Sequence, residues 1–478
     1  MQVEELVDLV HQIQAQKTES QGIEVKSARD GCPTRLFGTL SAFSNQDDGG
    51  VIVFGLDERA GFSAVGVYDP HDLQRKVTEQ CKQMEPIVRP LFTIATIDGH
   101  HVVAAEIPSV DADQRPVYYR GVGRNKGSYI RVGESNDLMS EYEIYSFDAF
   151  RKRIRDDLRP VVSARLSFFD PTRVERYLRA VKLDRRNIAD NVSDEGILEL
   201  MGVTVNGTPT LAGLMALSHY PQANFPQLCI TAVVVPGTSM GDTGTAGERF
   251  IANQRITGPI PDMLEAAVDF VRRNGRLTTV IGDDGKRVDR PEFPPLAVRE
   301  AILNALVHRD YSIHSESVPV RIVMYSDRME VTNSGGLYGN ISIDSLGKVR
   351  PDTRNPTLAN ILELLSVTEN RYSGIPTIRR ECDQAKLPAP LFAAQRGEFV
   401  VTFRNNLHAA IREASHDQVA ALLTFCSIPR SRDELTRFTG FSQYYTMSKL
   451  VQPLIDAGKI RLTMPERPRS RYQRFVTK

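Results

Sequence analysis

The chain lacks several features that would assign it to a class at once. Its 59 Lys and Arg residues balance 59 Asp and Glu residues, so nucleic-acid binding would have to come from local patches. The five cysteines are scattered without a Cys-x-x-Cys pair, which argues against a disulfide framework or a zinc site. No Gly-x4-Gly-Lys-Ser/Thr phosphate loop occurs, which excludes a helicase motor built on that loop.

Long hydrophobic runs are also missing. The longest apolar stretches, such as residues 230–235, are far too short to cross a bilayer, and the first twenty residues contain acidic side chains, unlike a secretion signal. We therefore expect a cytoplasmic protein that makes no membrane contact. A chain of 478 residues is too long for one core. We expect about three domains and a multidomain α+β fold class.

The most informative segment, residues 299–311, reads as a helix. Glu300 and Asn304 are four residues apart in it, which places both side chains on one face. A carboxylate and an amide placed in this way can hold a hydrated Mg²⁺ and orient a water molecule. Residues 331–337 then read as an apolar strand that ends in a Gly-rich turn, where backbone N–H groups can approach a phosphate or a base. Taken singly, each segment could equally be an ordinary helix or a tight turn.

In this order the two segments resemble the ATP-binding core of the GHKL family (gyrase, Hsp90, histidine kinases and MutL). The resemblance implies that residues 296–405 form a GHKL-like α/β sandwich that binds ATP, with Glu300 as general base and Asn304 as the Mg²⁺ ligand. Further nucleotide contacts are implied for the end of the helix, the Gly-rich turn and the lid: His308, Arg309, Asn333, Gly335, Gly336, Ser373 and Gly374. For His308 and Arg309, a network that only shapes the helix end is an equal alternative.

Two departures from the GHKL pattern favour nucleotide binding over turnover. Asn333 stands where these enzymes usually have the Asp that accepts from the adenine amine, and an amide reads that edge less selectively. Tyr372 replaces a lid glycine, which stiffens the loop next to the phosphates.

Residues 1–145 mix helices with short strands, and segments 116–119 and 128–133 are expected to pair as a hairpin. Four motifs occur in order: Glu-x-Lys-Ser at 24–27, Ser-Ala-Phe-x-Asn at 41–45, Gly-Gly-x3-Phe-Gly-x-Asp at 49–57 and Tyr-x-Arg-x-Gly at 129–133. Together they resemble the AlbA/Schlafen-type nucleic-acid-binding domain. Five basic side chains would line its groove and contact phosphates: Lys26, Arg35, Arg124, Lys126 and Arg131.

The same resemblance raises a nuclease hypothesis. In animal Schlafen proteins three carboxylates cleave RNA, and the matching residues here are Glu19, Glu24 and Asp57, which could hold one or two divalent ions. The alternative is structural, with Glu24 paired to Lys26 and Asp57 capping a turn. Residues 146–295 are expected to form a bridging α/β region with an apolar strand at 211–217, and no chemistry is assigned to it.

Residues 415–478 follow the helix, turn, helix, strand and wing order of a winged-helix DNA-binding domain. Residues 430–478 contain eleven Lys and Arg residues against four Asp and Glu residues, a concentration that indicates nucleic-acid binding in an otherwise neutral chain. Three residues would face a major groove: Gln443, Tyr444 and Lys449. Three more would lie on the wing: Arg467, Arg469 and Arg471. A winged helix used for protein contacts is the alternative.

The whole chain resembles bacterial transcriptional regulators of the RecG-like helicase-related family. This resemblance implies a nucleotide-responsive DNA-binding protein with ATP and Mg²⁺ as cofactors, double-stranded DNA as partner and a homodimer or higher homo-oligomer as the assembly. The alternative activity is a metal-dependent nuclease that cuts RNA or single-stranded DNA in phage defence. A third hypothesis is an ATP-dependent assembly scaffold without a nucleic-acid role.

Overall fold

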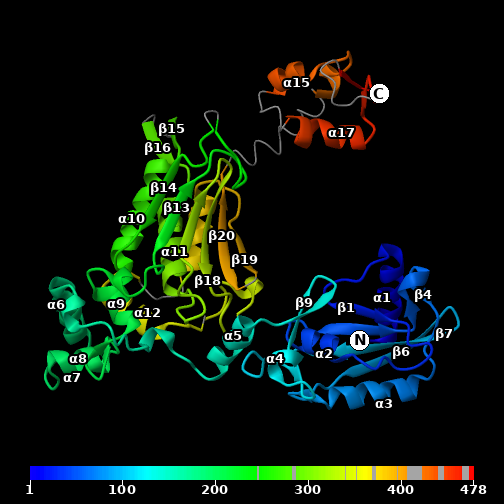
Figure 1. The fold of residues 1–478 in the computed structure, drawn as a ribbon, viewed down its shortest axis with the longest axis horizontal. Helices are drawn as coiled ribbons and strands as arrows, with labels where there is room; N and C mark the ends of the chain where they lie inside the picture. The colour runs from blue at the N-terminus through cyan, green and yellow to red at the C-terminus, as the bar shows by residue number, and fades with distance from the viewer. Residues whose placement is uncertain are drawn as a thin grey trace.

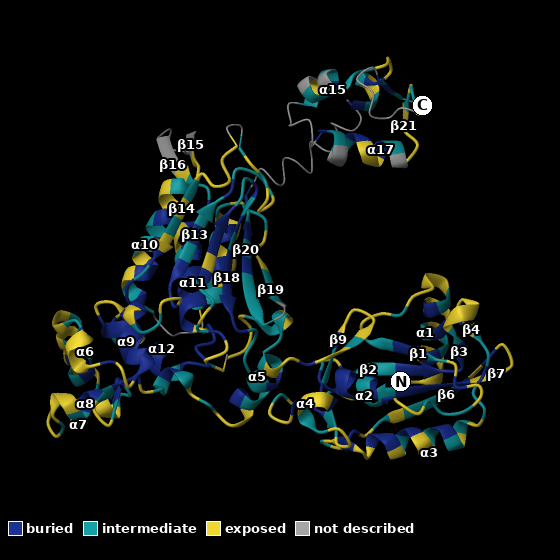
Figure 2. Cartoon of the chain, viewed as in Figure 1, coloured by how far each residue is buried: buried dark blue, intermediate teal, exposed yellow. Residues whose placement is uncertain are grey.

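The structure is a computed structural model that describes residues 1–244, 247–281, 287–339, 341–350, 352–368, 373–395, 397–405, 422–439, 446–465 and 473–477 (Figure 1). The chain forms an N-terminal domain, a larger domain around a six-stranded sheet, and a small C-terminal segment. Buried residues concentrate along the two larger sheets and their covering helices (Figure 2). The expected mixed α+β class is confirmed.

The N-terminal domain is built on a four-stranded sheet of order β1-β2-β7-β6, in which only the pair β1 and β2 is parallel. Its strands are β1 (Ile23–Lys26), β2 (Gly50–Phe54), β6 (Leu91–Ile97) and β7 (His100–Ile107). Successive strand side chains point to opposite faces, so each face has its own apolar core. Helices α2 (Phe37–Ser44) and α3 (Pro70–Cys81) cover one face, and α1 (Val3–Gln16) covers the other.

The hairpin expected between segments 116–119 and 128–133 is wrong. Strand β9 (Tyr129–Val132) pairs with β10 (Ser135–Leu138), whereas β8 (Tyr118–Tyr119) pairs with β5 (Met84–Glu85). The two expected partners meet only at an isolated bridge between Tyr118 and Ser128 among the described residues. A short helix, α4 (Arg124–Gly127), occupies the connection.

The larger domain is built on a six-stranded sheet of order β14-β13-β17-β18-β20-β19, with β13 parallel to β17 and the other pairs antiparallel. Its strands are β13 (Ile230–Val234), β14 (Ala252–Ile256), β17 (Val320–Met324), β18 (Arg328–Ser334), β19 (Leu391–Gln395) and β20 (Glu398–Arg404). Helix α11 (Pro295–Val307) lies against β18 and contacts both α10 (Ile260–Asn274) and α13 (Gly374–Gln384). One hydrophobic core runs from Val161 to Phe403, so the boundary expected near residue 295 falls inside it.

Residues 211–217 form helix α9 (Leu211–Leu217) and not the expected strand. All seven residues are buried, so the sequence shows neither strand alternation nor a helical period, and a short buried helix cannot be told from a buried strand. Thr210 starts the helix, because its Oγ1 accepts a hydrogen bond from the Gly213 N–H at 3.1 Å. The remaining helices around this core are α6 (Pro171–Asp184), α7 (Arg186–Ala189), α8 (Asp194–Leu200) and α12 (Pro356–Leu364).

The C-terminal segment has a small core of its own around Leu435, Val451 and Phe475. Its elements are α15 (Arg432–Thr439), a π-helical turn (Thr446–Val451), α17 (Gln452–Asp456), β21 (Ile460–Leu462) and β22 (Phe475–Thr477). Residues 440–445 and 466–472 lie outside the described part, so the winged helix stays a prediction. Among the described helices, none has both the length and the apolar character needed to cross a membrane.

Candidate functional site

One face of α11 carries the predicted pair. Glu300 and Asn304 are both partly accessible, whereas eight other residues of this helix are buried in the core. Pro295 occupies the first turn, where its missing N–H costs no hydrogen bond, and the helix ends at His308. Because the core fixes the buried face of α11, it also fixes the direction of the carboxylate and the amide.

The backbone at the start of α13 approaches this pair closely. A Cβ atom placed on Gly374 would lie 3.0 Å from Asn304 Nδ2 and 3.0 Å from Glu300 Oε2. Ser373 precedes the helix and is exposed. The first N–H groups of a helix have no helical partner and carry partial positive charge, which favours anions. The structure thus brings together the predicted Glu300, Asn304, Ser373 and Gly374.

The Gly-rich turn follows β18 and packs against the end of α11. Gly335 has φ +100°, and a Cβ there would lie 2.9 Å from the Asp310 backbone nitrogen, so only glycine fits. Asn333 is 5% exposed, and its Nδ2 donates to the Ser334 carbonyl at 3.0 Å. Gly336 has open space around its Cβ position within the described structure. The backbone of this turn therefore lies close to the residues that follow α11.

His308 continues the face of α11 one turn beyond Asn304. Its side chain is exposed to solvent, yet desolvation by the surrounding protein lowers its pKa to about 4, and the charge of Arg354 acts in the same direction. The imidazole is therefore neutral at physiological pH and can accept or donate one hydrogen bond.

Arg309 is buried, contrary to the expected nucleotide contact. The side chain is 1% exposed, and its Nη2 donates to the carbonyls of Ser315 at 3.1 Å and Val318 at 2.8 Å. Its guanidinium also lies 5.1 Å from the Tyr311 ring centre. Arg309 therefore holds the 310–318 loop in place. This agrees with the alternative in which Arg309 only shapes the end of the helix.

Three residues of this region were missed as site residues. Arg354 and Asp310 form an ion pair at 3.2 Å, with side chains 3% and 0% exposed. Asn355 donates to the carbonyls of Val307 at 2.8 Å and Arg309 at 2.8 Å, which joins α12 to the end of α11. The Arg-Asn-Pro sequence before α12 was the available signal, but it indicates a helix start and not a buried ion pair.

The proposed nuclease carboxylates do not form a metal site. Glu24 is 7% exposed and accepts from Arg131 Nη1 at 2.6 Å and from Lys26 Nζ at 2.6 Å. Glu19 accepts from the Val25 N–H at 2.8 Å, and desolvation is the largest cause that raises its pKa. Asp57 caps a 3-10 turn by accepting from the Arg59 N–H at 3.0 Å.

Within the described part of the chain, no three His, Cys, Asp or Glu side chains gather closely enough to hold a metal ion. The nuclease activity therefore stays a prediction from the sequence.

Arg131 is likewise not a phosphate contact. Its side chain is fully buried, and besides Glu24 it donates to Asn136 Oδ1 at 3.0 Å and to the Ile23 carbonyl at 3.0 Å. Lys26 keeps partial exposure, and Arg35 is exposed. Lys126 is exposed as well, whereas Arg124 is paired with Asp148 at 2.6 Å. Of the five predicted groove cations, Lys26, Arg35 and Lys126 are therefore accessible to nucleic acid.

A pair of variants separates these roles. Arg131→Met should destabilise the N-terminal domain by about 3–5 kcal/mol, because it leaves the buried Glu24 carboxylate without its main partner. Arg35→Met should leave stability within about 0.5 kcal/mol. It should also flatten the salt dependence of nucleic-acid binding by about one unit of slope. Thermal unfolding and salt titrations of binding measure both effects. Weakened binding by Arg131→Met at unchanged stability would contradict this assignment.

The predicted C-terminal contacts cannot be placed. Gln443, Tyr444, Arg467, Arg469 and Arg471 lie outside the described residues, as does the side chain of Lys449. Tyr372 of the lid also lies outside them. Their roles remain predictions from the sequence.

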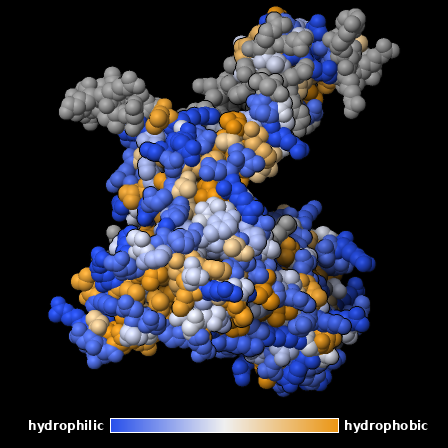
Figure 3. Space-filling model, turned by 60° about the vertical axis from the view of Figure 1, so that its left-hand side comes forward, coloured by the Kyte–Doolittle hydropathy of each residue, from blue (hydrophilic) through white to orange (hydrophobic). Residues whose placement is uncertain are grey.

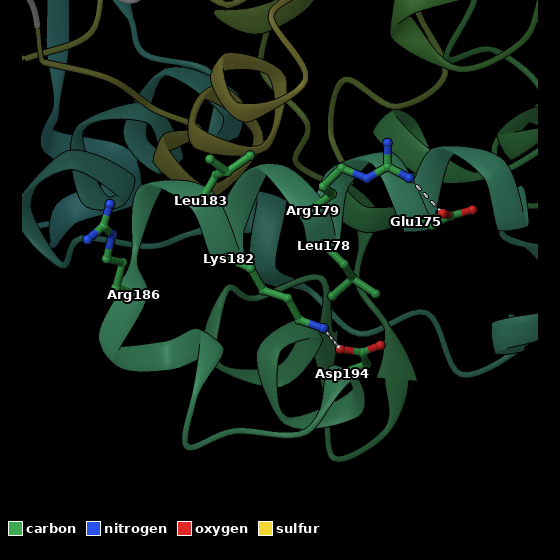
Figure 4. A pocket seen from close by; sticks show the side chains of 7 residues that line it. All are labelled: Glu175, Leu178, Arg179, Lys182, Leu183, Arg186 and Asp194. Carbon is green, nitrogen blue, oxygen red and sulfur yellow. Dashed lines mark hydrogen bonds and ion pairs between the residues drawn. The ribbon is translucent and has the colours of Figure 1, made fainter.

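A hollow of about 490 Å³ lies between α6 and α8, away from α11 (Figure 4). Figure 4 shows Arg179 directed to Glu175 and Lys182 directed to Asp194, and these ion pairs measure 2.8 and 2.5 Å. Hydrophobic and hydrophilic residues are interspersed on the face of the molecule that Figure 3 shows. Leu183, which is 76% exposed, lines the hollow (Figure 4). Four of the charged side chains that line the hollow therefore form ion pairs with one another. For this reason we do not take the hollow as the candidate site.

Comparison with known proteins identifies two parts of the chain. Residues 19–140 match the family described as "Schlafen, AlbA_2", and residues 318–403 match the family described as "Putative ATP-dependent DNA helicase recG C-terminal". The chain therefore combines an AlbA/Schlafen-type domain with a RecG-type ATPase-like domain, as both resemblances implied. No curated protein matches the chain.

Two solved structures resemble the chain more distantly. The DIP2311 protein from Corynebacterium diphtheriae is 19% identical over 95% of this chain and 93% of that chain, with a TM-score of 0.38. The N-terminal domain of a RecG-related protein from Nitrosomonas europaea is 27% identical over 28% of this chain and 92% of that chain, with a TM-score of 0.23.

Proposed function

We propose that this protein binds Mg·ATP along the face of α11 and that nucleotide occupancy changes its affinity for nucleic acid. The observation that carries the proposal is the approach of Gly374 to both Glu300 and Asn304, at 3.0 Å from each to its Cβ position. A backbone without a side chain, a helix start, a carboxylate and an amide meet at this point. That combination suits a phosphate group and its Mg²⁺ ion.

Each residue has a distinct role in this proposal. The Asn304 amide oxygen would ligate Mg²⁺ together with phosphate oxygens, and the free N–H groups at the start of α13 would receive the phosphates. Glu300 would orient a water molecule. The bound ion would neutralise phosphate charge. Gly335 and Gly336 would let the backbone approach the base, and His308, which is exposed at the end of α11, would contact the nucleotide between base and phosphates.

Nucleic acid is the proposed partner because the matched AlbA/Schlafen-type domain keeps exposed basic side chains. Lys26 and Arg35 are accessible there, and the basic segment 430–478 would add a second contact to double-stranded DNA. A homodimer or higher homo-oligomer that regulates transcription is the finer form of the proposal.

Binding of labelled duplex DNA with and without saturating Mg·ATP tests this function. We expect the dissociation constant to change by about 5- to 150-fold, the usual range of coupling between two sites. Asn304→Ala serves as the control, since its DNA affinity should no longer respond to the nucleotide. Identical affinity in wild type at saturating nucleotide would contradict the proposal.

A further inference from the structure

Helix α5 (Glu141–Arg151) begins one residue after the AlbA/Schlafen match ends and connects that domain to the ATPase-like domain (Figure 1). Ser140 starts the helix by accepting from the Glu143 N–H, while Glu143 accepts from the Ser140 N–H, a reciprocal cap that fixes its first turn. The helix is therefore a well-defined element between the two domains.

One side of α5 holds the AlbA/Schlafen-type domain. Arg124 in α4 donates from both terminal nitrogens to the two carboxylate oxygens of Asp148, each at 2.6 Å. The two side chains are 23% and 16% exposed, so solvent screens this fork only partly. Movement of α5 would thus pull directly on α4.

Aromatic side chains of α5 also pack against the ATPase-like domain. Phe150 meets the Tyr338 ring edge-on, with centres 5.3 Å apart. Tyr145 lies 4.8 Å from the His314 ring centre. Tyr142 presses on Gly397 so closely that a Cβ there would lie 2.6 Å from its ring. These rings bury large apolar area and give α5 a definite docked position.

Tyr338 connects α5 to the Gly-rich turn, which ends two residues before it. The Arg354 guanidinium lies 4.8 Å from the Tyr338 ring centre and pairs with Asp310 at 3.2 Å. Asp310 in turn donates its backbone N–H to the Ser334 carbonyl at 2.8 Å, where Gly335 packs against it. A continuous set of contacts therefore runs from the turn to α5.

We propose that α5 transmits the nucleotide state of the ATPase-like domain to the AlbA/Schlafen-type domain, with Tyr338 as the contact that links the Gly-rich turn to Phe150. The inference rests on the nucleotide site proposed above. A base held at the turn constrains residues 335–338 and favours the docked position of α5, which fixes α4 through Asp148. Coupling requires an element whose position both sites influence, and α5 contacts both.

Reciprocal linkage gives the test. In wild type, Mg·ATP should change the affinity for duplex DNA, and DNA should change the affinity for Mg·ATP by the same factor, about 5-fold or more. Tyr338→Ala at one end and Arg124→Gln at the other should each bring this factor close to one. Each variant should keep its affinity for DNA alone and for Mg·ATP alone within about 3-fold of the wild-type value. Tyr220→Ala, which replaces an exposed tyrosine away from α5, should keep the wild-type factor.

Hydrogen exchange gives an independent reading on wild type. Backbone amides of residues 141–151 should exchange more slowly when Mg·ATP is bound. Unchanged exchange there, or wild-type coupling in both variants, would overturn the role of α5 while leaving the proposed function intact. Wild-type coupling in both variants would indicate that DNA acts through residues 415–478. Absence of Mg·ATP binding in wild type would instead contradict the proposed function itself.

Discussion

Gly374→Val should abolish measurable Mg·ATP binding and leave the fold intact. The added Cβ would lie 3.0 Å from Asn304 Nδ2 and Glu300 Oε2, so the branched methyl groups would displace the two side chains proposed to hold Mg²⁺ and orient water. Hydrogen bonds to charged groups contribute about 1.5–3 kcal/mol each. Loss of two of them weakens binding by about 100-fold or more. Calorimetric titration with Mg·ATP measures this loss.

Gly241→Val is the matched control for this substitution. Gly241 is exposed, and no described atom lies within 4 Å of its Cβ position. Its affinity for Mg·ATP and its thermal unfolding should both match wild type. Wild-type affinity in Gly374→Val would show that the nucleotide does not occupy the space between α13 and α11.

Arg354→Met should strongly destabilise the larger domain. Asp310 is fully buried, and without Arg354 its carboxylate would lose the partner at 3.2 Å. Removing one member of a buried ion pair costs about 3–5 kcal/mol. That cost is a large part of the total stability of a domain, which is about 5–15 kcal/mol. Urea unfolding measures the loss of stability. Hydrogen exchange of the β17 and β18 backbone amides shows whether the larger domain is the one affected.

Two further variants show whether the ion pair causes this loss. Arg165→Met replaces an exposed arginine and should change stability by less than about 0.5 kcal/mol. The double variant Asp310→Asn with Arg354→Met removes both charges, so it should recover part of the stability lost in Arg354→Met alone. Equal stability of Arg354→Met and wild type would mean that the pair contributes nothing to the fold.

The spacing of Glu300 and Asn304 was readable from the sequence because helix geometry alone places residues four apart on one face. The Gly-rich turn was readable for a similar reason, since glycine marks positions that require a positive φ, as Gly335 does. Neither inference depended on distant parts of the chain.

The roles of the basic side chains could not be predicted in the same way. Arg131 and Arg309 look like phosphate contacts in the sequence, yet both are buried and bonded to acceptors brought from elsewhere in the fold. Burial decides whether a guanidinium binds a ligand or holds a loop, and burial depends on tertiary packing. The same limit applies to Arg354, whose partner Asp310 lies more than forty residues away in sequence.

The extent of the larger domain could not be predicted from the sequence, for a related reason. Strand β13 pairs in parallel with β17 across a long connection that contains α10 and α11. Local composition gives no signal for such a pairing, so the sequence predicts a separate bridging region before residue 295. The hydrophobic core joins residues on both sides of position 295.

Titration of the wild-type protein with ATP in the presence and absence of Mg²⁺, followed by calorimetry, tests the central claim most directly. The arrangement of Glu300, Asn304 and Gly374 predicts saturable binding of one nucleotide per chain that weakens strongly when Mg²⁺ is chelated. No heat of binding at millimolar ATP with Mg²⁺ present would contradict the account, because the face of α11 would then hold no nucleotide.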